Sequence, residues 1–221
     1  MRRRMIFADR DEAGLLLAER LGGMDLVAPL VLALPRGGVP VAAQIARRLG
    51  APLDVALVRK LGAPDEPELA IGAVADGDEP EIVLNARVVE DLGVTEEFIQ
   101  SATARELAAI AQRRSDYAGV RPRVTPSSRT AIVVDDGVAT GMTMQAALRA
   151  IRRQNPARVI VAVPVASRDA VAMLRREADD VICLSAPRRF GSVGSFYRTF
   201  GQVSDADVER LLVAAAARAS A

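Results

Sequence analysis

Two adjacent carboxylates, Asp135 and Asp136, directly follow residues 131–134, an apolar run with the character of a buried strand. The loop 137–143 is built of small residues and ends in Thr-Gly-Met-Thr, after which a helical pattern begins. Backbone N–H groups in such a loop, at the start of a helix, form a site for an anion, and the threonine hydroxyls add donors. Carboxylates at the end of a strand accept hydrogen bonds from hydroxyl groups or help to hold Mg²⁺. The pattern therefore indicates a ligand with a phosphate at one end and a vicinal diol at the other, as in a ribose 5-phosphate.

Two further loops carry residue types suited to binding an anion. Pro35-Arg36-Gly37-Gly38 follows the expected strand 30–34; glycine lets the backbone turn its N–H groups towards an anion, and arginine adds a fixed charge. Arg59 and Lys60 follow the expected strand 53–58 and could neutralise a departing anion. Each loop has a simpler interpretation, because Gly-Gly before a helix is usually a turn and two charges at a strand end are often only solvated.

Composition excludes several kinds of catalyst. The chain has no histidine, which excludes a Ser-His-Asp or Cys-His nucleophile, a histidine general base and a His-ligated zinc. Its single cysteine, Cys183, cannot form an intrachain disulfide or a Cys-only zinc site, which fits a reducing compartment. Residues 2–4 are arginines, as at the start of a signal peptide, but Asp9 ends the apolar stretch. No uninterrupted apolar run approaches the roughly 20 residues of a membrane helix. We therefore predict a cytoplasmic protein with no membrane partner.

Charge is balanced overall but not along the chain. The formal net charge is +1, so nothing predicts a nucleic-acid partner. Residues 60–100 hold eleven acidic side chains and two basic ones, Lys60 and Arg87. This segment is either a solvated acidic lobe or a separate lobe over a basic core that holds anions.

Alternating strand and helix patterns predict how these loops are positioned. Strands are expected over 30–34, 53–58, 82–84, 131–134, 159–163 and 181–184, and a short one over 70–74. Helices are expected over 9–21, 38–49, 95–117, 142–154 and 168–176, with a last helix after Ser204; 61–80 is expected to be a mobile loop and 121–128 a linker. This order predicts an α/β fold with a mainly parallel central sheet flanked by helices, whose strand ends carry the ligand loops.

The segment Ile132-Val133-Val134-Asp135-Asp136-Gly137-Val138-Ala139-Thr140-Gly141-Met142-Thr143 resembles the phosphoribosyl-pyrophosphate (PRPP) signature of the type I phosphoribosyltransferases. Pro35-Arg36-Gly37-Gly38 resembles the pyrophosphate loop of that family, and Arg59-Lys60 resembles the pair that opens its mobile catalytic loop in adenine-type members. The whole chain is similar to a group of uncharacterised bacterial phosphoribosyltransferases. Two alternatives are an acidic strand end that merely caps a helix and a phosphorelay receiver, which lacks the Thr-Gly-x-Thr loop.

The resemblance implies a fold and an activity. It implies one domain over residues 1–221, with a core at about 30–184 and a small hood, the subdomain that recognises the base, formed by 81–128 and the tail 185–221. Members transfer ribose 5-phosphate from PRPP to a nitrogen acceptor, usually a nucleobase, and release pyrophosphate. It also implies a Mg²⁺-dependent enzyme of nucleotide metabolism and salvage that forms a homodimer, with PRPP and a small-molecule base as its partners.

The resemblance also assigns roles to residues. Asp135 and Asp136 would bind the ribose hydroxyls and assist Mg²⁺, partly through water, and together with Arg59 and Lys60 they would be the catalytic groups. The residues implied in PRPP binding are Arg36, Gly37, Gly38, Asp135, Asp136, Gly137, Val138, Ala139, Thr140, Gly141, Met142 and Thr143. Phe190, Phe196 or Tyr197 could stack on a base, or they could pack the hood onto the core.

Two departures from the family pattern leave a second class of function open. Gly137 stands where the family usually has an apolar residue. The segment 65–68, Asp-Glu-Pro-Glu, makes the expected mobile loop acidic, and an acidic lid opposes the charge of pyrophosphate. The alternative to a transferase is therefore a non-catalytic regulatory protein of the same fold that binds PRPP or a nucleotide.

Overall fold

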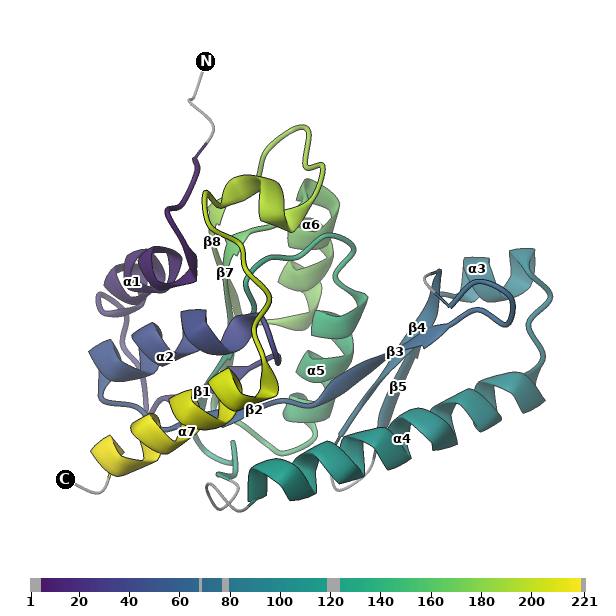
Figure 1. Cartoon of the computed structure of the whole chain (residues 1–221), viewed down its shortest axis with the longest axis horizontal. Coiled ribbons are helices and arrows are strands. Elements are labelled where there is room, and N and C mark those ends of the chain that lie inside the picture. The colour runs from purple at the N-terminus through teal and green to yellow at the C-terminus, as the bar shows by residue number, and fades with distance from the viewer. Residues whose placement is uncertain (1–4, 68, 77–79, 119–123, 220–221) are drawn as a thin grey trace.

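A five-stranded parallel sheet forms the centre of the molecule (Figure 1). The computed structural model describes residues 5–67, 69–76, 80–118 and 124–219. The strands lie in the order β2 (Leu53–Val55), β1 (Leu30–Ala33), β6 (Thr130–Val134), β7 (Arg158–Val165) and β8 (Asp180–Ser185). Residues of β1 and β6 are buried throughout, as expected for parallel strands that are covered on both faces. The predicted α/β fold with a parallel central sheet is confirmed.

Helices cover both faces of this sheet, and alternate strand residues contact each layer. One layer contains α1 (Arg10–Leu21), α2 (Gly38–Leu49) and α7 (Asp205–Ala219); the other contains α5 (Met142–Arg152) and α6 (Arg168–Glu177). Val31 and Ile132 pack in the first layer, whereas Leu32 and Val133 pack in the second. This two-sided core fixes the strand ends from which the predicted ligand-binding loops start.

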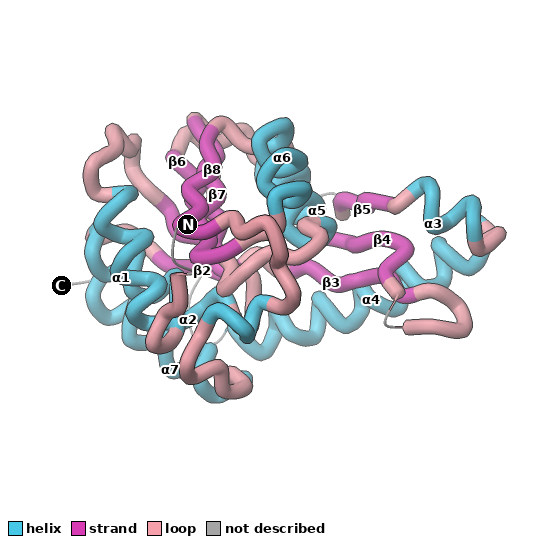
Figure 2. The backbone as a smooth tube through the Cα atoms, turned by 90° about the horizontal axis from the view of Figure 1, so that it is seen from above, coloured by secondary structure: helices cyan, strands magenta, loops and turns pink. Residues whose placement is uncertain are grey.

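A second sheet extends sideways from the first (Figure 2). It is antiparallel, with the order β3 (Val58–Gly62), β4 (Ala70–Ala75) and β5 (Glu81–Leu84), and α3 (Ala86–Asp91) and α4 (Glu96–Ala118) follow it. Helix α4 runs along this sheet, and its buried Ala102 and Ile110 join the same apolar cluster as Leu61 and Ile71 (Figure 1). The predicted hood segment 81–128 thus begins inside a sheet that starts at Val58.

The structure corrects the sequence prediction between residues 53 and 80. The expected strand 53–58 is two pieces, because the chain leaves the parallel sheet after Val55 and enters the antiparallel one at Val58. Arg59 and Lys60 therefore lie within β3 and do not follow a strand. The expected loop 61–80 is largely the hairpin of β3 and β4, with buried Leu61 and Ile71. Side chains alternate between the two faces of a strand in either kind of sheet, so the sequence does not show that the chain leaves one sheet and joins the other.

Helix ends follow their capping residues. The α2 helix stops at Gly50, whose φ of 61° is left-handed. Thr95 accepts from the Phe98 N–H at 3.3 Å at the start of α4, and Ser204 accepts from the Asp207 N–H at 3.1 Å at the start of α7. Both helices begin where the sequence predicts them to begin. The short α3 was not predicted, although Asn85 marks its start by accepting from the Val88 N–H. Of the predicted linker 121–128, residues 121–123 lie outside the described residues, as do residues 1–4.

The first and last parts of the chain meet beside the carboxyl end of the central sheet. The Phe7 N–H donates to the Phe196 carbonyl at 2.8 Å, and the Phe7 carbonyl accepts from the Arg198 N–H at 2.9 Å. Phe196 ends a 3-10 helix, η1 (Val193–Phe196). Over the residues that the structure describes, no helix has both the length and the apolar character needed to cross a membrane.

Candidate functional site

The loops after β1 and β6 touch each other at the carboxyl edge of the parallel sheet. Ala33 pairs with Val134, so both strands end at the same level, and the Leu34 N–H donates to the Val134 carbonyl at 2.8 Å. A Cβ at Gly37 would overlap the Asp136 carboxylate, and a Cβ at Gly38 would lie 2.7 Å from the Val134 carbonyl oxygen. Glycine is therefore required at both positions by close packing. The structure thus brings Pro35–Gly38 and the paired carboxylates into direct contact.

The two carboxylates are held in surroundings that disfavour their charged forms. Asp135 is half-buried, and its Oδ1 accepts from the Asp136 N–H at 2.8 Å. Burial raises the pKa of Asp135 well above its usual range, and the neighbouring Asp136 charge raises it further. Burial also raises the pKa of Asp136, against the opposing effect of Arg10. Paired acidic groups with raised pKa values at the end of a buried strand mark a functional site.

Arg10 is a member of this site that the sequence did not reveal. Its Nε and Nη2 both lie 2.8 Å from Asp136 Oδ2, and its Nη1 donates to the Gly201 carbonyl at 2.8 Å. The guanidinium lies 3.9 Å from the centre of the Phe200 ring. Asp136 is also held through its backbone, because the Tyr197 hydroxyl donates to the Asp136 backbone carbonyl at 2.5 Å. Arg10 is one of 28 arginines, and no motif distinguishes it from the others.

The loop 137–143 is pinned between β7 and the start of α5. The Val138 N–H donates to the Val165 carbonyl, and the Ser167 hydroxyl donates to the Ala139 carbonyl at 2.6 Å. Gly141, with a φ of 87°, leads directly into α5. Ala139 and Thr140 are exposed. The predicted phosphate-binding loop therefore lies at a helix N-terminus, with its middle accessible to a ligand.

Gly137, the first departure from the family pattern, has a packing reason. A Cβ there would lie 2.5 Å from Val193 Cγ1, in η1 of the tail segment. Glycine is needed because the tail packs directly on the turn.

Arg59, Lys60 and Thr143 line one cleft of about 630 Å³ between β3, α4 and the start of α5. The Arg59 Nε lies 3.0 Å from an oxygen of Glu106, on α4. The structure therefore brings these cations beside Thr143, the last residue of the predicted phosphate-binding loop. The carboxylates and the Gly-Gly turn lie outside the lining of this cleft.

Arg36, predicted to bind pyrophosphate, faces the start of α7. Its Nη1 lies 3.4 Å from an oxygen of Asp205, which Arg113 also approaches at 3.4 Å. The Tyr117 hydroxyl donates to Asp205 at 3.1 Å, and burial raises the pKa of Tyr117 to about 12. Arg36 thus already contacts an anionic group at the edge of the site.

The aromatic residues of the tail form a packed cluster. Phe196 is fully buried and Tyr197 is 7% exposed. Tyr197 lies 5.5 Å from Phe7 and 4.9 Å from Phe200, and Phe190 lies 5.6 Å from Phe196, between ring centres. Of the two interpretations offered for these side chains, packing onto the core describes Phe196 and Tyr197.

Comparison with known proteins gives the class to which this fold and site belong. Residues 11–197 match the phosphoribosyl transferase domain family, and the chain belongs to that family. The crystal structure of TT1426 from Thermus thermophilus shares 47% identity, covers 95% of this chain and 99% of its own, and superimposes with a TM-score of 0.81. Provisionally named phosphoribosyl transferases of two Mycobacterium tuberculosis strains are each 42% identical over 207 residues. That match covers 94% of this chain and 46% of the relative, so the chain spans about half the length of these curated relatives.

Proposed function

We propose that this chain transfers ribose 5-phosphate from Mg·PRPP to a nitrogen acceptor, with release of pyrophosphate. The observation that carries the proposal is the contact between the Gly-Gly turn and the paired carboxylates, next to a phosphate-type loop at the start of α5. PRPP carries a diol, a 5-phosphate and a pyrophosphate. The paired carboxylates suit the diol, the loop at the start of α5 suits the 5-phosphate, and the Gly-Gly turn suits the pyrophosphate. Membership of the phosphoribosyl transferase domain family supports the same assignment.

Each part of the site would hold a different part of PRPP. Asp135 and Asp136 accept hydrogen bonds from the ribose hydroxyls, and the backbone of 139–143 with the Thr140 and Thr143 hydroxyls donates to the 5-phosphate. The backbone at Gly37 and Gly38 binds pyrophosphate together with the side chain of Arg36. The acceptor nitrogen bonds to C1′ and loses a proton as the C1′–O bond breaks, and the bonding electrons leave with pyrophosphate. Positive charge develops at the sugar, so positioning and charge neutralisation account for most of the catalysis.

Magnesium fits this site as part of the substrate. Over the described parts of the chain, no group of three or more His, Cys, Asp or Glu side chains could hold a metal ion. Asp135 offers a half-buried carboxylate, whereas Asp136 is engaged by Arg10. We therefore propose that Mg²⁺ arrives on PRPP, keeps several waters, and meets Asp135 and Asp136 partly through them.

A second candidate function, a regulatory protein that binds PRPP or a nucleotide without turnover, is favoured by the pairing of two cations. Arg36 contacts Asp205 and Arg59 contacts Glu106, so two groups predicted to neutralise pyrophosphate already have carboxylate partners. Exposed Asp65 and Glu66 add negative charge at the turn of the β3–β4 hairpin. Turnover requires that these contacts yield to pyrophosphate or that Lys60 suffices.

Pyrophosphate release from Mg·PRPP distinguishes the two functions. A pooled set of purine, pyrimidine and pyridine bases is compared with a control without base, and a positive pool is then divided to identify the acceptor. Base-dependent release is the result expected for a transferase. Binding of PRPP with release equal to the control would support the regulatory protein.

Lys60→Ala tests the role of the cleft. If Lys60 neutralises the leaving pyrophosphate, this variant loses turnover more than PRPP affinity. Equal loss of both, or loss of neither, would contradict a catalytic role.

The predicted homodimer is tested on the same samples by light scattering after gel filtration.

A further inference from the structure

The Arg10–Asp136 pair is built more tightly than an ordinary surface ion pair. Two guanidinium nitrogens lie 2.8 Å from one carboxylate oxygen, Oδ2, and the side chains are only 12% and 13% exposed. The third nitrogen donates to the Gly201 carbonyl, and the guanidinium plane is supported by Phe200. All these contacts fix Arg10 in one position, because its fork of donors is rigid.

We propose that Arg10 is a positioning residue of the PRPP site: it holds Asp136 by Oδ2 and so directs Oδ1 towards the ligand. This inference rests on the function proposed above. Both Arg10 contacts are on the same oxygen, which leaves the other oxygen of Asp136 available to accept from a ribose hydroxyl. Ribose recognition is then divided between Asp135 and a single oxygen of Asp136.

Arg10 also sets the charge of the site. The Gly37 backbone, predicted to bind pyrophosphate, packs directly against Asp136 Oδ2. A highly charged anion bound there would face two carboxylates at short range, the half-buried Asp135 and the buried Asp136. The Arg10 guanidinium compensates one of them on its buried side, which lowers the repulsion without occupying the position of the ligand.

A second ion pair provides a matched control at the opposite edge of the sheet. Arg158 Nε and Nη2 lie 2.9 and 2.5 Å from one oxygen of Asp180, and Arg158 Nη1 donates to the Asp25 carbonyl at 3.3 Å. The geometry therefore repeats that of Arg10, but at the start of β7 and β8, away from the ligand loops. A purely structural arginine should behave like Arg158.

The test is a calorimetric titration of Mg·PRPP into four purified proteins, together with their melting temperatures. Arg10→Gln is expected to weaken binding roughly tenfold, which is about 1.4 kcal/mol, because a charged contact of Asp136 is lost. Arg158→Gln is expected to bind like the wild type even though it melts earlier. The double variant Arg10→Gln with Asp136→Asn is expected to bind better than Arg10→Gln alone, because the asparagine keeps Oδ1 and removes the uncompensated charge.

Arg10→Lys keeps the test usable if Arg10→Gln does not fold. A single ammonium cannot reproduce the fork of donors, so an intermediate loss of affinity is expected. The proposal is overturned if the folded Arg10 variants bind Mg·PRPP as the wild type does, or if the double variant binds no better than Arg10→Gln. Absence of PRPP binding by the wild type would instead overturn the proposed function, and this inference with it.

Discussion

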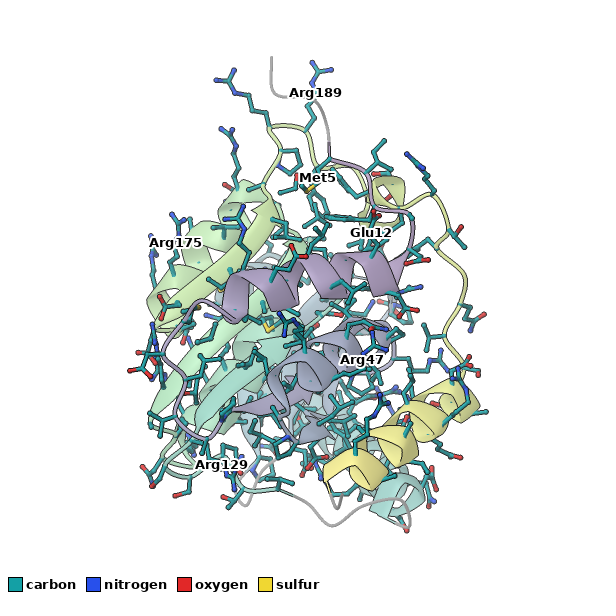
Figure 3. All side chains as sticks on the ribbon, turned by 90° about the vertical axis from the view of Figure 1, so that its left-hand side faces the viewer. Met5, Glu12, Arg47, Arg129, Arg175 and Arg189 are labelled. Atoms are coloured by element: carbon teal, nitrogen blue, oxygen red, sulfur yellow. The ribbon has the colours of Figure 1, made fainter. Side chains whose placement is uncertain are left out.

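The pKa values of carboxylates are lowered at one edge of the parallel sheet and raised at the other. At the edge where β7 and β8 begin, hydrogen bonds from Arg149 lower the pKa of Glu177, and those from Arg152 lower the pKa of Asp179. At the carboxyl edge, burial raises the pKa of Asp135 and Asp136. Figure 3 shows the separation of the edges, with Arg129, just before β6, at one end of the molecule and Arg189, just after β8, at the other. Three ion pairs lie at the edge where β7 and β8 begin: Arg149–Glu177, Arg152–Asp179 and Arg158–Asp180.

The carboxyl edge is therefore less stable than the opposite edge at neutral pH. Carboxylates with arginine partners favour the folded state at neutral pH, whereas buried charges with incomplete compensation oppose it. Asp135 has no arginine at hydrogen-bond distance among its described contacts. The ligand that we propose for Asp135 would explain why a carboxylate is kept under these conditions.

The largest expected effect is on ligand affinity at the carboxyl edge. Asp135→Asn removes the charged acceptor that we propose for the ribose hydroxyls and should weaken Mg·PRPP binding about a hundredfold, or about 2.7 kcal/mol. Asp180→Asn, at the other edge, should leave affinity unchanged. Calorimetry measures both variants, and an equal loss in the two would erase the distinction between the edges.

Close packing at Gly37 gives the next effect. Gly37→Ala places a Cβ into the Asp136 carboxylate, so the loop or the carboxylate must move, at an expected cost of about 1–3 kcal/mol in the free energy of unfolding. Affinity for PRPP should fall as well. Gly50→Ala is the control, because its left-handed φ gives strain with no atom within 4 Å of the new Cβ. Denaturant unfolding and calorimetry should show stability loss in both variants and affinity loss only in Gly37→Ala.

Stability should depend on pH with opposite sign at the two edges. The pKa of Asp135 is raised above the usual 3.8, so the folded state binds its proton more tightly and wild-type stability falls as pH rises through this window. Asp135→Asn avoids this loss and should therefore unfold at a higher denaturant concentration than the wild type at pH 7. The advantage should shrink as pH falls towards 4; an advantage that grows there would contradict the account.

The smallest effect belongs to the paired edge. The pKa of Glu177 is lowered from 4.5, so its contribution is present above that pH and is lost as pH falls through the lowered pKa. Glu177 is partly exposed, so Glu177→Gln should cost at most about 1 kcal/mol at neutral pH. Melting curves at pH 7 and pH 3 should show a difference from the wild type only at the higher pH, and PRPP affinity should not change.

Much of the fold and the principal loops could be predicted from the sequence. Apolar runs located the central strands, and Thr95 and Ser204 stand where two of the predicted helices begin. These signals could be recognised because they are local in the sequence. The spacing around Asp135 predicts a diol end and a phosphate end, and these roles stay predictions. The structure places the carboxylates of this segment against Gly37 and Gly38.

What could not be predicted depends on contacts between distant parts of the chain. The chain enters the second sheet at Val58 because β3 pairs there with β4. The alternation of apolar residues along the sequence does not show with which strand a segment pairs. Arg10 reaches Asp136 across 126 positions, and Asp205 reaches Arg36 across 169. Such ion pairs follow from tertiary packing, and an arginine on a helix has no pattern that reveals its partner.

Hydrogen exchange measured by mass spectrometry, with and without Mg·PRPP, tests the central claim most directly. If PRPP binds at the carboxyl edge, exchange should slow on binding in residues 34–38 and 135–143, with no change in residues 153–159 and 177–181 at the opposite edge. Protection confined to the opposite edge, or saturating binding with no protection at either carboxyl-edge loop, would contradict it.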